Sequence, residues 1–177
     1  MIKRSCLIFT AVLLVVTAGS LACAQQPQSA NPQKTPNDSM ESMNERGDKV
    51  MGFDHTKTTH HFLLKTDGGV IQIEANDNAD TASRDEIRMH MKHIAKMFGE
   101  GNFSAPMLIH EQDPPGADVM KQLKAKIKYE FGENERGAFI RISTGDAEAL
   151  NAIHEFLRFQ ITEHMTGDPL EVRATKQ

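Results

Sequence analysis

The sequence contains only two cysteines, Cys6 and Cys23, and both lie within its first 24 residues. The rest of the chain therefore has no disulfide, no thiolate metal site and no thiol nucleophile. Tryptophan is missing altogether, and there is a single tyrosine. The stability of the chain after residue 24 must therefore come from a hydrophobic core.

Motifs that would name an activity are also missing from the sequence. There is no G-x-S-x-G, no P-loop, no G-x-G-x-x-G after a predicted strand, no H-E-x-x-H and no C-x-x-C-H. The sequence thus favours a non-enzymatic role. An enzyme is the third hypothesis, and it would require a cleft in which His60 or His61 contacts a carboxylate such as Glu86.

Lysines and arginines form no run outside the first few residues. The formal net charge is −4, and it becomes −6 without residues 1–24, which hold two basic residues and no acidic one. A moderately acidic domain is a poor partner for nucleic acid or for an anionic membrane surface. We therefore expect no nucleic-acid partner.

Residues 1–24 have the pattern of a secretory signal peptide. A basic start precedes the apolar run Leu7–Val16, which is too short to span a membrane, and an A-x-A site at 22–24 precedes Gln25. The sequence predicts an exported protein, periplasmic or secreted, that is not an integral membrane protein. A lipid anchor through Cys23 is the less favoured alternative, because Ser20 stands where a lipid-attachment box normally has leucine.

The remainder of the chain divides by composition. Residues 25–50 are rich in Gln, Pro, Asn and Ser and have little to bury, which predicts a disordered linker. A single domain is expected over residues 51–173, followed by a short tail at 174–177.

Within this domain the order strand, strand, helix occurs twice. In the first half, alternating segments at 58–65 and 70–75 flank a turn at 67–69, and Ser83 and Glu86 have capping-box spacing before a helix that ends at Gly99. The second half has strands at 127–131 and 138–143 and a helix from about Asp146, closed by Gly167.

The segment between the two halves is less regular. Residues 104–110 suggest a short strand, which Pro106 would confine to a sheet edge, and a short helix is expected at 118–126 after the Pro-Pro-Gly breaker. The predicted fold is α+β, with a mainly antiparallel sheet and the two longer helices packed on one face.

One stretch of the first helix, RMHMKHIAKMF at 88–98, is rich in histidine and methionine. Beside the predicted core face runs a second stripe at helical spacing, made of Glu86, His90, His93 and Met97. Imidazoles three or four positions apart on a helix can bind a transition metal, and a thioether beside them favours copper. The alternative is an ordinary helix boundary with half-buried histidines.

Further ligands would have to come from other segments. His60 shares its parity with Phe62 and should point inward, while the neighbouring His61 points to the other face. His110 and Met107 are candidates from the middle segment, with His55 as another option, whereas packing and capping roles are expected for His154 and His164.

These observations predict an exported, non-enzymatic metal-binding protein, with copper as the favoured ion. The main alternative is a small module that binds an organic ligand, non-covalent haem or a protein partner, with the histidines only lining its groove.

Overall fold

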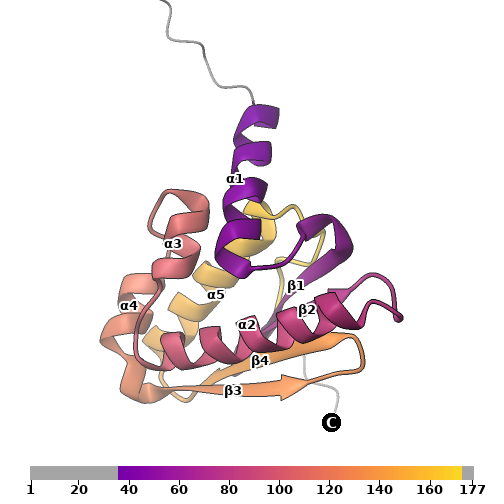
Figure 1. Ribbon diagram of the computed structural model, residues 1–177. Coiled ribbons are helices and arrows are strands. Elements are labelled where there is room, and N and C mark those ends of the chain that lie inside the picture. The colour runs from indigo at the N-terminus through magenta and orange to yellow at the C-terminus, as the bar shows by residue number, and fades with distance from the viewer. Residues whose placement is uncertain (1–35, 173–177) are drawn as a thin grey trace, which may run out of the picture. The chain divides into compact units, whose positions relative to one another are not determined.

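The computed structural model describes residues 36–172, so the predicted signal segment and the tail lie outside this part of the chain. It is an α+β domain with five helices and one antiparallel sheet (Figure 1). In chain order the elements are α1 (Pro36–Met51), the 3₁₀ turn η1 (His55–Lys57), β1 (Thr58–Lys65), β2 (Gly68–Ala75), α2 (Thr81–Gly99), α3 (Ser104–His110), α4 (Ala117–Gln122), the 3₁₀ turn η2 (Lys124–Lys126), β3 (Ile127–Glu133), β4 (Gly137–Thr144) and α5 (Ala147–Glu163).

The sheet has the strand order β1-β2-β4-β3, and every neighbouring pair is antiparallel. Its register aligns one apolar row across all strands: Phe62 lies opposite Ile71, Ile71 opposite Ile140, and Ile140 opposite Phe131. Because side chains alternate along a strand, this row and its neighbours at every second position face the same side. That side is the core.

Helices α2 and α5 both cover this face, which confirms the predicted architecture. α2 contacts β2, β3 and β4, and α5 contacts β1, β2 and β4. Gly69 allows α5 to approach closely, since a Cβ atom there would lie 2.1 Å from the Leu157 side chain. The face of α2 predicted from the sequence is buried as expected, with Ile87, Met91, Ile94 and Phe98 all inside.

Aspartates begin both long helices. The Asp146 side chain accepts hydrogen bonds from the backbone amides of Glu148 and Ala149 at the start of α5. At α2 the N-cap is Asp80, whose carboxylate accepts from the backbone amide and hydroxyl of Ser83. The predicted capping box starting at Ser83 is therefore wrong, because a carboxylate three residues earlier takes the capping role.

The edge strand predicted for residues 104–110 is also wrong, since this segment forms α3. The Asn102 side chain accepts from the backbone amide of Ser104 and starts the turn. Pro106 is tolerated because it falls in the first turn of the helix, where an amide has no intrahelical partner. The helix brings His110 to its C-terminal end, buried and in contact with α5.

The linker predicted for residues 25–50 lies only partly within the described residues, and in that part the chain forms α1. Met43 is buried, and the Arg46 side chain donates to the carbonyl of Ile109 at 2.8 Å, which ties α1 to α3. Met43 and Gly47, four positions apart and both buried, form a short inward-facing stripe that the polar composition conceals. No described helix has both the length and the hydrophobicity to cross a bilayer.

Candidate functional site

Histidines from four different elements gather around one small cavity lined mostly by buried residues. His60 of β1, His90 of α2 and His164, which follows α5, line it directly, and Gln160 completes its polar part. The remaining lining is apolar or thioether and includes Met51 and Met91. The cavity has a volume of about 60 Å³.

The imidazole rings are in contact with one another. Those of His60 and His164 are nearly parallel, with 8° between their planes and 5.5 Å between centroids. The ring of His110, at the end of α3, meets His164 edge-on at 5.0 Å. Phe53 packs against His90 at 5.6 Å and His60 at 6.2 Å and so closes this side of the group. We call His60, His90, His110 and His164 the histidine cluster.

The chemistry of His110 is fixed by its neighbour. Its Nε2 atom lies 3.2 Å from Oε1 of Gln160. Because an amide oxygen can only accept, Nε2 carries the proton and Nδ1 carries the lone pair. Nδ1 is buried without a hydrogen-bond partner, and its nearest carboxylate oxygen, on Glu163, is 3.9 Å away. With this tautomer, His110 Nδ1 is a buried nitrogen with a free lone pair.

Three of the buried side-chain atoms that lack a hydrogen-bond partner belong to this region: His60 Nε2, His110 Nδ1 and Gln160 Nε2. His60 is half-buried as a residue, but its Nε2 atom is fully covered. Leaving a buried polar atom unpaired costs about 1–3 kcal/mol. Such atoms concentrated in one place mark a position where a ligand, an ion or a buried water would supply the missing partner.

Burial keeps the cluster uncharged. It lowers the pKa of His60 and of His90 to about 4 and that of His164 to about 3, with the neighbouring imidazoles acting in the same direction. Burial also lowers the pKa of His110, against the opposing effects of Gln160 and Glu163. At neutral pH these rings are neutral, which is the form that coordinates metals.

The residues predicted from the sequence are partly brought together. His60 and His90 line the same cavity, and His110 lies next to it. The helical stripe itself does not converge, because Glu86 and His93 are exposed and Met97 packs half-buried against the core. Met107 is 40% exposed on α3.

His61 points to the opposite face of the sheet, as its parity required. Its Nδ1 atom lies 3.1 Å from the Asp168 carboxylate, which also accepts from the backbone amide of Phe62 and from the Thr166 hydroxyl. The histidine–carboxylate contact sought for an enzyme thus involves Asp168 and not Glu86. The Asp168 carboxylate accepts from a strand amide and from two side chains. This explains it as a structural contact that holds the segment after α5 against β1.

His164 was not predicted to belong to the site, because a capping role at the helix end was expected for it. His164 does occupy the C-cap of α5, but its ring lies in the cluster. It stands seven positions after Leu157 and three after Ile161, so it continues the buried face of α5 by one more turn. His154, by contrast, has the expected packing role and lies 2.9 Å from the carbonyl of Lys65.

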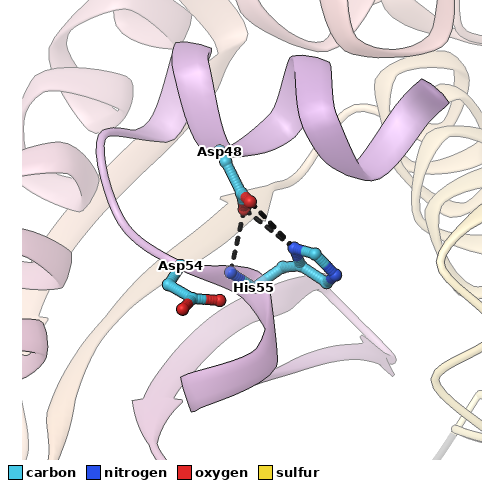
Figure 2. Close-up of side chains that lie close together, drawn as sticks. All are labelled: Asp48, Asp54 and His55. Carbon is cyan, nitrogen blue, oxygen red and sulfur yellow. Dashed lines mark hydrogen bonds and ion pairs between the residues drawn. The ribbon is translucent and has the colours of Figure 1, made fainter. Parts of the chain in front are cut away.

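A second group of possible ligands lies near the surface, where α1 leads into η1 (Figure 2). Asp48, Asp54 and His55 form the only set of three such side chains in the described part of the chain whose ligand atoms lie within 4.8 Å of one another. Asp48 accepts from the backbone amide of His55 at 2.8 Å and lies 2.9 Å from its Nδ1. Asp54 accepts from the amide of Thr56 and caps η1. Both carboxylates therefore have structural partners.

Comparisons of the sequence and the fold with protein-family models, curated proteins and solved structures found no match.

Proposed function

We propose that this chain is an exported, non-enzymatic metal-binding protein that holds a copper ion in the histidine cluster. His60, His110 and His164 would be the ligands, with His90 at the rim. The observation that carries the proposal is the pair of buried, unpartnered nitrogens, His60 Nε2 and His110 Nδ1, on the two rings that contact His164. Export rests on the signal peptide predicted for residues 1–24.

The spacing of the rings suits a shared ion. With metal–nitrogen bonds of about 2.0–2.1 Å, two imidazoles at a tetrahedral angle have centroids about 5 Å apart. The two contacts of His164 measure 5.0 and 5.5 Å. The nitrogens of the three rings do not yet lie within 4.8 Å of one another, so binding requires side-chain rotation to point the lone pairs at one centre.

The surrounding atoms favour copper over harder ions. Met51 and Met91 line the same cavity, and no thiolate is present in residues 25–177. Imidazole suits copper and zinc alike, whereas thioether sulfur selects Cu(I). An ion that can use both donor types is therefore the best match to the lining.

The size of the cavity separates this proposal from its main rival. Pockets for organic ligands usually measure about 300–1,000 Å³. A cavity of about 60 Å³ has room for an ion or a few water molecules, and haem would require the helices to move apart.

The test is a titration of residues 25–177, purified without a histidine tag, with Cu(I), Cu(II) and Zn(II) against a competing chelator. We expect one Cu(I) per chain, a dissociation constant below about 1 μM, and a rise in melting temperature because the folded state alone presents the site. Haem reconstitution should leave no Soret band with the protein once unbound haem has been removed. Weak copper binding without stabilisation would overturn the proposal, and a Soret band would favour the rival.

A further inference from the structure

A second hollow lies on the outer side of the histidine cluster and opens to the surface. It has a volume of about 400 Å³ and is lined by Met40, His55, His60, His164 and Met165, together with small polar residues. His60 and His164 also line the inner cavity. These two histidines therefore lie between the inner cavity and this outer hollow, which we call the acceptance groove.

His55 is held ready in the groove as a ligand. Its Nδ1 lies 2.9 and 3.0 Å from the two oxygens of Asp48 (Figure 2), and because a carboxylate only accepts, Nδ1 carries the proton. The Nε2 atom is then left with the lone pair. A carboxylate behind one ring nitrogen is the usual way in which proteins orient a metal-binding histidine.

Met165 supplies a thioether at the mouth of the groove. It is 71% exposed, and its backbone has φ 46°, a left-handed conformation that residues other than glycine seldom adopt. That conformation belongs to the end of α5, where the Met165 amide donates to the carbonyl of Thr162 and the Thr166 amide donates to that of Ile161. The large apolar side chain, however, is left in water without a packing role. A solvent-facing sulfur that lines a groove with three imidazoles does have a chemical one, because it can take part in ligand exchange with a soft ion.

Building on the proposed function, we propose that the acceptance groove is the route by which Cu(I) reaches the histidine cluster. Met165 and His55 bind the ion first, and His164 and His60 then take it inward by exchanging one neutral donor for another. Copper stays Cu(I) throughout, no proton is released, and each new bond to a ring nitrogen replaces one to an outer ligand. The chemical partner is a Cu(I) ion offered on a labile soft ligand.

The groove makes a kinetic prediction that differs from that of the inner site. Met165→Leu should slow Cu(I) uptake from a coloured Cu(I)–chelator complex by about tenfold, within the range over which mutants of one interface change association rates. The equilibrium dissociation constant should stay the same, so release should slow by the same factor. His55→Ala should act in the same direction. Stopped-flow absorbance gives both rates, and competition at equilibrium gives the affinity.

Met89→Leu is the matched control, because Met89 is also 71% exposed but lies on α2 and does not line the groove. Uptake at the wild-type rate in Met165→Leu and His55→Ala, with copper still bound tightly, would overturn the route and leave the inner site standing. A fall in affinity equal to the fall in rate would also overturn it, since Met165 would then be a resident ligand. Absence of a tight copper site in the wild type would instead reject the proposed function.

Discussion

The rings of His60 and His164 lie face to face, with 8° between their planes and 5.5 Å between their centroids, although one belongs to the first strand and the other follows the last helix. Their contact exists only when β1 and α5 are packed together. Any ion that bridges them therefore binds the folded chain alone and must stabilise it. Because folding also buries these rings, their pKa values differ between the folded and the unfolded chain.

The metal-free protein should lose stability as the pH falls from about 6.5 toward 4. The pKa of His60 and of His90 is lowered to about 4 and that of His164 to about 3, against an ordinary value of 6.5. The unfolded chain therefore takes up protons first, and the free energy of unfolding decreases with falling pH across this interval. Urea denaturation at pH 7.5, 6 and 5 measures the slope.

Two variants test whether burial of the histidine cluster causes this dependence of the free energy of unfolding on pH. His164→Phe should flatten it, because the variant no longer buries that titrating ring. His93→Gln should change it much less, since His93 is exposed on α2 and acts only through its charge on His90. Equal slopes in His164→Phe and the wild type would show that the acid sensitivity comes from other groups.

Copper binding should distinguish the helical stripe from the histidine cluster. His93→Ala removes an exposed imidazole and should leave the Cu(I) dissociation constant within about twofold, whereas His164→Ala removes the ring between His60 and His110 and should weaken binding at least tenfold, since even outer-shell changes cost about 10–100-fold. Chelator competition measures both constants, and circular dichroism checks that each variant is folded. Loss of binding in His93→Ala with retention in His164→Ala would restore the stripe as the site.

The elements of the fold were predictable where one local signal dominated. The alternation of apolar and polar residues predicted the strands at 58–65 and 70–75, and the helical spacing of apolar residues predicted the helix at 87–98. Both long helices pack against the sheet through their apolar faces, as expected. The segment at 104–110 was not, because Pro106 is compatible with a strand edge and with a first helical turn alike. Only the hydrogen bond from the Ser104 amide to the Asn102 side chain and the contact of His110 with Gln160 of α5 decide between them.

The site was predictable only in part, because its residues are adjacent in space and distant in sequence. Parity placed His60 inside, and helical spacing drew attention to His90. His110 and His164 meet only where the end of α3 touches α5, which no local pattern encodes. The stripe on α2 drew attention to one helix, with partners expected from the first hairpin and the middle segment, whereas the clustered histidines come from four elements.

The junction before α4 should be sensitive to a single added methyl group. Gly116 has φ 80°, and a Cβ atom there would lie 2.1 Å from the carbonyl oxygen of Ala152 in α5. Gly116→Ala combines backbone strain with a clash against main chain, so it should lower the free energy of unfolding by about 2 kcal/mol or more. Gly145→Ala is the control, because nothing lies within 4 Å of a Cβ atom there. Similar stabilities of the two variants would contradict the close approach of α4 and α5.

The choice of copper rests on thioether sulfur, which a volume-conserving substitution can remove. Met91 is 1% exposed and lines the inner cavity, and Met120 is 0% exposed and does not. Met-to-Leu changes in a core usually cost less than about 1.5 kcal/mol, so both variants should fold. Met91→Leu should weaken Cu(I) binding by about tenfold while leaving Zn(II) binding unchanged, because only the soft ion uses the sulfur. Met120→Leu should change neither constant. If Cu(I) and Zn(II) affinities fall together in Met91→Leu, the residue shapes the cavity without coordinating, and the histidines alone would have to account for any preference for copper.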